Sequence, residues 1–428
     1  MENGFPEGLA LQERVEECRK PNRTTLATLM TDSDADSGSR FSQSIKILLN
    51  CSRLFGLFYE RKQLNDKCAR LHKSMLPSLL LCLILACNAV RSLTVYHTQG
   101  QSDEVLFFKV QLSIWSFESA VKAFVMFFYS YRQDGFSEFF RKWSEYFGNQ
   151  VPDQFTILIM KISTVICCVF VFVQTLGILL SFFLSKDLAE LFTLVSWCQA
   201  LDESSLLVMK LLMTFVVFLN SAAAVFPIAM LVVLSLAVIK RFDDFGEEFK
   251  SCVSLQGDFH GDLENYRSRH QKLCILVDIL DRVFMAVIAI VCVADTVMFC
   301  IILHNLIYTM MPASYRILNL FWLVMMLLHI VIVSAVGAWM NVSAHSPLTS
   351  IYNIRPSRQI HSRHLEMTMF ISRLTDTRIG LTPGKMFVID KSSILTIAGM
   401  MITYFIVVLE FKQGGDPTPP SCNCTVSA

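Results

Sequence analysis

The sequence predicts an all-α membrane protein with seven transmembrane helices. Hydrophobic residues make up 53% of the 428 residues and charged residues only 17%, whereas roughly a quarter of a typical soluble chain is charged. Apolar stretches of about 20 residues, the length that crosses a hydrocarbon core about 30 Å thick, recur along the chain. Basic residues gather in every second connection, which favours a cytoplasmic N-terminus and an extracellular C-terminus.

Residues 1–44 are predicted to form a disordered cytoplasmic N-terminal segment. They are polar and include an acidic, Ser-rich run from Thr31 to Ser42, a composition that offers too little apolar surface to fold. The segment has no apolar core followed by a small-residue cleavage site, so no secretory signal peptide is expected. The first span is therefore expected to act as its own membrane anchor.

Seven apolar stretches follow this segment. They run roughly over residues 75–97, 105–130, 157–184, 206–239, 283–309, 315–340 and 386–411. The fourth is longer than a bilayer requires, which predicts a helix that either extends into the cytoplasm or kinks near Pro227. We therefore expect a six-span bundle over 45–340, and a cytoplasmic helix, the last span and a short extracellular tail over 341–428.

The orientation rests on lysine and arginine. The segment before the first span and the second, fourth and sixth connections are rich in them. The intervening connections have none between His97 and Glu104, only Lys186 between the third and fourth spans, and none in the tail after Lys412. Because cytoplasmic loops are enriched in basic residues, the N-terminus is expected inside.

Two cytoplasmic connections are helical in pattern. The fourth, from Phe242 to Asp281, mixes charges with apolar residues that recur at helical spacing between Leu273 and Leu280, which favours packed helices over a solvated loop. The sixth contains a re-entrant-like, interfacial helix from His361 to Arg378. A turn at Thr382–Gly384 then leads into the last span, which ties that span to cytoplasmic structure.

The last span has a face that mixes small polar, apolar and acidic side chains. At helical spacing this face holds Thr396, Met400, Thr403, Val407, Glu410 and Phe411. Such a face suits a water-filled path with an apolar constriction. The alternative is ordinary helix packing with Glu410 reaching the headgroups, since an acidic residue at a helix end costs little.

The end of this span also carries a short motif. Thr403 and Tyr404 are followed by five hydrophobic residues, then Glu410 and Phe411. This run resembles the C-terminal signature of arthropod gustatory receptors, which is Thr-Tyr, five hydrophobic residues and Gln-Phe. Chain length, seven spans, an inward N-terminus and a long fourth connection are similar to that family as well.

The resemblance implies a ligand-gated, non-selective cation channel in the plasma membrane, built from four subunits around one pore. The tetramer is expected to contain this chain alone or with related receptors, and a small-molecule tastant is expected to bind in the outer half of the first six spans. Carried onto this chain, the pore and gate would use Thr403, Val407, Glu410 and Phe411. Glu410 departs from the family pattern, and four copies would form an acidic ring that concentrates permeant cations.

Polar and aromatic side chains inside other spans are candidates for the ligand pocket, because ionisable groups in a membrane usually face the bundle interior or water. The candidates are Trp115, Glu118, Asp295, His304, Tyr308 and Trp322. Arg91 and Asn305 share this character. A structural ion pair involving Arg91, and aromatic belts at the membrane interface, are the alternatives.

Other chemistry is not expected. No nucleophile–base set, phosphate loop, metal cluster or cofactor motif stands out, so the chain is not expected to be an enzyme, and its net charge of +1 gives no reason to expect nucleic acid. His361 and His364 lack nearby acids or thiols and are expected on a solvated face.

Asn423 is the candidate glycosylation site outside the cell. One disulfide is a hypothesis for the cysteines expected outside, Cys198, Cys422 and Cys424.

Two other functions remain open from the residues alone. A seven-pass G-protein-coupled chemoreceptor would need the opposite topology to the one that the basic residues favour. A secondary transporter would be expected to show two related halves, and no internal repeat is evident. The identity of the ligand, whether a sugar, a bitter compound, carbon dioxide or an internal nutrient, is not determined.

Overall fold

The structure is a computed structural model, and it describes residues 41, 45–58, 75–94, 103–132, 134–148, 154–184, 203–254, 256–308, 312–354 and 361–413. These residues are helical throughout, apart from turns, short connections and one isolated bridge between Val253 and Phe259. The helices are α3 (Lys46–Leu54), α4 (Leu76–Thr94), α5 (Asp103–Tyr131), α6 (Phe136–Phe147), α7 (Gln154–Leu184), α9 (Glu203–Ser251), α10 (Leu263–Ile290), η3 (Val291–Asp295), α11 (Thr296–Tyr308), α12 (Ala313–His345), α13 (Pro347–Tyr352), α14 (His361–Asp376) and α15 (Lys391–Gln413). The predicted disordered segment lies almost wholly outside the described residues.

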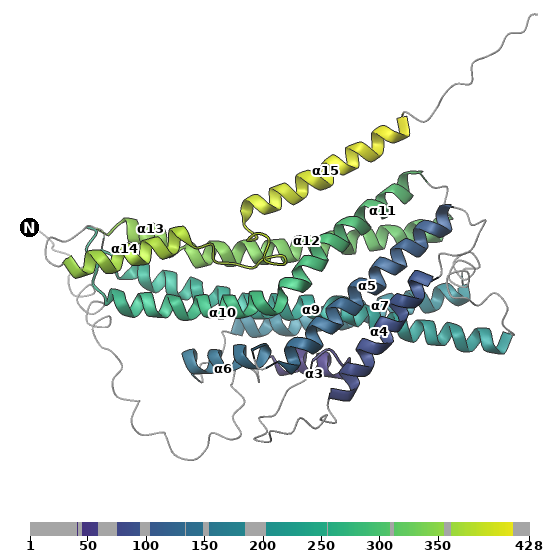
Figure 1. The fold of residues 1–428 in the computed structure, drawn as a ribbon, viewed down its shortest axis with the longest axis horizontal. Helices are drawn as coiled ribbons and strands as arrows, with labels where there is room; N and C mark the ends of the chain where they lie inside the picture. The colour runs from purple at the N-terminus through teal and green to yellow at the C-terminus, as the bar shows by residue number, and fades with distance from the viewer. Residues whose placement is uncertain are drawn as a thin grey trace, which may run out of the picture.

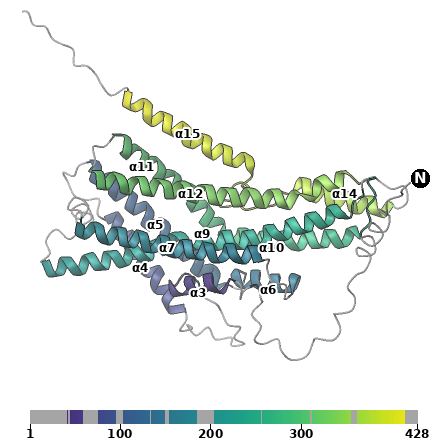
Figure 2. The same ribbon diagram turned by 180° about the vertical axis from the view of Figure 1, so that it is seen from behind.

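The all-α membrane fold is confirmed, and each predicted span corresponds to a described helix. Among the described residues, five stretches are long and apolar enough to cross a membrane: Leu76–Leu93, Thr156–Phe183, Ser204–Ser251, Leu263–Tyr308 and Ala313–Tyr352. The other two predicted spans are α5, which carries charged residues in its interior, and α15, whose apolar run covers Lys391–Val407. In Figures 1 and 2 the long helices form one elongated bundle, and α15 lies along one side of it.

The fourth span is one continuous helix of 49 residues, α9, which passes through Pro227. Its last turns pack against α10, and the apolar residues that the sequence singled out there are buried. Phe245 is 2% exposed, Phe249 0% and Leu276 0%. The prediction of packed helices in the fourth connection is therefore confirmed. We call the end of the bundle that contains α13, α14 and these turns of α9 and α10 the α14 end (Figure 1).

The fifth span continues a helix of the fourth connection and is not a regular α-helix throughout. Helix α10 begins at Leu263, within the connection that was predicted to be helical, and a π-helical segment, η3, joins α10 to α11. A π-helical turn holds one residue more than an α-turn, so it rotates the faces of the helix that follows. Asp295, the last residue of η3, is fully buried.

Helix α14 packs with α10 and α13 at the α14 end (Figure 1). Only part of its predicted apolar face is covered. Phe370 and Leu374 are each 1% exposed, whereas Leu365 is 59% exposed and Met369 57%.

The connection from α14 to α15 is held against α10 and α12. The carboxylate of Asp281 on α10 accepts hydrogen bonds from the backbone N–H of Thr382 (2.6 Å) and from its hydroxyl (2.7 Å), and it also accepts one from the ammonium group of Lys385. Gly384 adopts a positive φ of 58°, and its N–H donates to the carbonyl of Met285 at 3.0 Å. The predicted tie between the last span and the rest of the bundle is thus a set of specific bonds.

The predicted start of the last span near residue 386 is wrong, because α15 begins at Lys391. Ile389 is fully buried, and its N–H donates to the carbonyl of Leu381 at 2.9 Å, so this apolar stretch belongs to the folded connection. Asp390 ends the connection, and its carboxylate accepts from the backbone N–H of Ser393 at 2.8 Å. That bond, with bonds from neighbouring hydroxyls, holds the pKa of Asp390 below its usual range, as expected for an acid that caps a helix N-terminus.

Candidate functional site

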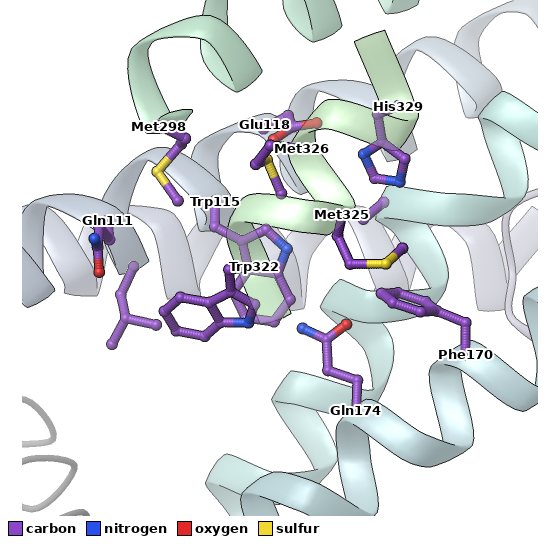
Figure 3. Close-up of a pocket in the computed structure, with 12 residues that line it drawn as sticks. Gln111, Trp115, Glu118, Phe170, Gln174, Met298, Trp322, Met325, Met326 and His329 are labelled. Carbon is purple, nitrogen blue, oxygen red and sulfur yellow. The ribbon is translucent and has the colours of Figure 1, made fainter. Parts of the chain in front are cut away.

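A cavity lies inside the bundle, away from the α14 end, between α5, α7, α9, α11 and α12 (Figure 3). The space between its walls that no protein atom fills is about 460 Å³, a figure that includes open space at its mouth. Its lining residues are Gln111, Leu112, Trp115, Glu118, Phe170, Gln174, Ala224, Met298, Trp322, Met325, Met326 and His329.

The middle of the cavity is aromatic. Figure 3 shows the indole rings of Trp115 and Trp322 between Gln111 on one side and Phe170 and Gln174 on the other. Trp322 is held by Phe108, whose ring stacks on it with centroids 6.0 Å apart and planes 14° from parallel. The methionines add soft, polarizable surface that adapts to the shape of a ligand.

One wall of the cavity is charged. Glu118 lines the cavity and forms a buried ion pair with Lys122, one turn further along α5. The ammonium group of Lys122 also donates to the carbonyl of Ala224 on α9, at 3.3 Å. Asp295 lies behind this wall, and its Oδ2 is 3.4 Å from Nδ1 of His329, which lines the cavity from α12.

These four side chains, Glu118, Lys122, Asp295 and His329, form one group, which we call the buried charge cluster. Each member is at least nine-tenths buried. Electrostatic interactions connect Glu118 with both Asp295 and His329, and Lys122 with both Asp295 and His329. Such interactions are strong because the surroundings have a low dielectric constant.

Two polar atoms in the cavity lack hydrogen-bond partners within the described part of the chain. Gln111 donates through Nε2 to Oδ1 of Asn319 at 3.2 Å, but its Oε1 is buried without a partner. Nδ1 of His329 is also buried and makes no hydrogen bond. Buried polar atoms are normally satisfied, so unsatisfied ones that line a cavity indicate room for a polar group of a ligand or for water.

The structure brings together four of the six residues that the sequence suggested for the pocket. Trp115, Glu118 and Trp322 line the cavity, and Asp295 lies directly behind its wall. His304 and Tyr308 lie elsewhere, near the end of α11, where their rings stack with centroids 4.7 Å apart. They pack against each other and are not among the lining residues.

The sequence analysis missed several residues of the site. Gln111, Gln174 and His329 are polar residues inside spans, so they carried the same signal that selected Glu118. Lys122 carried a further signal, because it stands four residues after Glu118, the spacing at which opposite charges pair on a helix. Arg91, which was considered, donates instead to Oδ1 of Asn88 on its own helix.

The second candidate site is α15. Along residues 402–407 every side chain is exposed, and so is Glu410. Val407 is 39% exposed, whereas Met401, on the side toward the bundle, is 9% exposed. The side chain of Phe411 lies outside the described residues, as do Asn423 and the cysteines Cys198, Cys422 and Cys424.

A family model described as the trehalose receptor matches residues 156–422, which is more than half of the chain and includes α7, α9 to α12, α14 and α15. The chain belongs to the trehalose receptor family. The resemblance to gustatory receptors drawn from the sequence is therefore confirmed, and so is the expectation that the chain is a multi-pass membrane receptor and not an enzyme.

The fold of this trehalose receptor family member is similar to that of an insect olfactory receptor, OR5 from Machilis hrabei. The structure of OR5 in complex with eugenol matches with a TM-score of 0.65 and 15% identity over 87% of this chain and 98% of OR5. A second structure of OR5 matches with a TM-score of 0.62 and 15% identity, over 86% of this chain and 98% of OR5. At this identity the likeness concerns the fold.

One curated relative is similar over a shorter stretch. The probable G-protein coupled receptor egl-47 of Caenorhabditis elegans is 22% identical over 98 residues, which is 23% of this chain. This chain covers 19% of the length of egl-47, so the similarity is confined to about a fifth of that protein.

Proposed function

We propose that the chain is a subunit of a chemosensory, ligand-gated cation channel of the plasma membrane, with α15 lining the pore and the cavity binding a small-molecule tastant. The observation that carries this proposal is the exposure of α15. A helix that is exposed on most sides can be covered by lipid or by other subunits, but Thr403 and Glu410 are poor lipid-facing groups. Four copies of α15 around an axis would cover this surface and give the polar residues a water-filled path.

The similar fold of OR5 and its complex with eugenol support a small-molecule ligand in this fold. The cavity has the mixture of aromatic and polar lining residues that is typical of sites for such ligands, and its methionines can move to enlarge it. Helices α11 and α12 both contribute residues to the lining of the cavity, and both contact α15 directly. A rearrangement of these helices around a ligand would therefore reach the pore helix.

In this proposal the N-terminus is cytoplasmic and Glu410 lies at the outer mouth of the pore. Four carboxylates in a ring would concentrate cations and favour divalent ones. Val407, about one turn below Glu410, would form the apolar constriction with Phe411. The assembly would be a tetramer of this chain alone or of this chain with related receptors.

The test is electrical recording from cells that express the chain, with a panel of sugars and bitter alkaloids. We expect a direct ligand-evoked cation current, a lower permeability to divalent relative to monovalent cations in Glu410→Gln, and altered opening in Val407→Ala. Two exposed residues outside α15, Glu247 and Val331, provide matched controls as Glu247→Gln and Val331→Ala. Unchanged permeability ratios in Glu410→Gln would remove Glu410 from the pore.

The similarity to egl-47 makes a G-protein-coupled receptor the second candidate. The two functions separate in excised membrane patches, where GTP and soluble proteins are absent. A current that persists there supports the channel, and a response that requires a G protein and has no direct current contradicts it.

A further inference from the structure

The buried charge cluster contains more carboxyl groups than positively charged groups. Glu118 and Asp295 supply two carboxylates, Lys122 supplies one ammonium group, and the His329 imidazole is neutral unless it takes up a proton. The other lysine buried in α5, Lys109, stands nine residues before Glu118, about 13 Å along the helix, and does not line the cavity. A net negative charge in a buried site is costly, so one carboxyl group of the empty site is favoured to hold a proton, and the ammonium group of a ligand can take the place of that proton.

The cavity is built so that a ligand can reach this charge. Glu118 and His329 both line it, and Figure 3 places them on the same side, next to the indole rings. The buried and unsatisfied Oε1 of Gln111 is an independent sign that a polar ligand group belongs in this cavity. Trp115, Trp322 and Phe170 present aromatic rings, which attract cations and also cover apolar surface.

We propose that the cavity selects small molecules with a protonated amine, whose ammonium group binds at Glu118 beside His329 while the apolar body lies between Trp115 and Trp322. Asp295 acts from behind the wall, by supplying the uncompensated negative charge. A neutral ligand of the same shape would fill the cavity but would gain no ion pair with these carboxyl groups. This inference deepens the proposed small-molecule site, but it does not require that the protein conducts ions.

The test compares two soluble probes of nearly equal shape, 2-phenylethylamine, which is cationic at neutral pH, and 2-phenylethanol, which is neutral. The full-length protein is reconstituted in lipid nanodiscs, and each probe is titrated while tryptophan fluorescence is followed, since two tryptophans line the cavity. Nanodiscs without protein measure partition into lipid. We expect the amine to bind at least about tenfold more tightly than the alcohol. Equal affinities, tighter binding of the alcohol, or no binding of either probe at millimolar concentration would overturn the proposal.

Asp295→Asn removes the uncompensated charge with little change in shape. We expect it to lower the affinity for 2-phenylethylamine to about that for 2-phenylethanol and to change the affinity for the alcohol by less than about twofold. Asp278→Asn is the matched control, because Asp278 is an exposed aspartate on α10, far along the helix from η3. If Asp295→Asn does not fold, Glu118→Gln makes the same change in net charge and is expected to have the same effect.

Retention of the amine preference in the variant that folds would contradict the role of the cluster. Because the assay measures binding, its result is independent of the channel. A preference for the amine without any ligand-evoked current would support the amine site and contradict the channel. A current evoked only by neutral ligands would support the channel and contradict the amine site.

Discussion

The bundle packs differently in two regions. The α14 end has an aromatic core, whereas the half around the cavity contains buried polar and charged groups. At the α14 end Phe249 is fully buried, and its ring lies within 6.3 Å of the rings of Phe245, Phe259, Tyr266 and Phe370. Around the cavity the buried residues include charges, unsatisfied polar atoms, methionines and a π-helical segment. A dense aromatic core resists deformation, whereas a polar cavity with adaptable side chains can reorganise around a ligand. The contrast indicates a rigid α14 end and a softer half that can rearrange around the proposed ligand.

The largest expected effect is a loss of stability at the α14 end. Phe249→Ala should lower the free energy of unfolding by about 3–5 kcal/mol, because it removes a fully buried ring and leaves a cavity. Chemical denaturation in detergent micelles measures this loss, and Phe117→Ala is the control, since Phe117 is 52% exposed. Binding of 2-phenylethylamine at conditions where the variant is folded should be unchanged. A parallel fall in affinity would show that the two regions are not separable.

A smaller loss of stability is expected at Asp281, which holds the connection between α14 and α15. Asp281→Asn keeps the shape but removes the charge that accepts from Thr382 and Lys385, at a cost of about 2–3 kcal/mol, as for hydrogen bonds to charged groups. The connection before α15 should then open more often, and hydrogen exchange of the Thr382 and Gly384 amides should accelerate. Asp258→Asn, at an exposed aspartate between α9 and α10, should leave that exchange unchanged. Equal protection in both variants would mean that Asp281 does not hold the connection.

The smallest effect concerns two glycines. A Cβ on Gly337 of α12 would lie 2.9 Å from side-chain atoms of Ile389, whereas nothing lies within 4 Å of a Cβ on Gly399 of α15. Gly337→Ala should destabilise the protein by about 1–3 kcal/mol through overpacking. Gly399→Ala should not, and at an exposed helix position it should stabilise α15 slightly. Denaturation midpoints of the two variants test this, and equal midpoints would contradict the close packing of the connection on α12.

Much of the fold is determined locally, which is why the sequence predicted it. Length and hydropathy select the spans, and the helical spacing of residues such as Leu273 and Leu276 selects the buried face of α10. The family motif around Thr403 and Glu410 is likewise a local pattern. These signals depend on neighbouring residues, so they can be recognised without knowing how the helices pack.

The last helix shows where local pattern reasoning failed. Residues 386–390 are largely apolar, and the sequence pattern predicts that they belong to the span. In the structure Ile389 packs against Gly337, and its N–H donates a hydrogen bond to the carbonyl of Leu381. Hydropathy cannot distinguish an apolar residue that faces lipid from one that packs under a loop. Asp390 followed by Ser393 was a local sign of a helix start that the analysis did not use.

The sequence alone determined that this is a seven-span helical receptor of a chemosensory kind and which polar residues were costly enough to matter. Only the tertiary structure decided which of those residues meet. Glu118 on α5, Asp295 on η3 and His329 on α12 are far apart in the chain, and η3 changes the face on which Asp295 lies, so their approach depends on how three helices pack. Charge and hydropathy can be assigned to each residue from the sequence, whereas a binding site depends on the distances between side chains, which are set by helix packing.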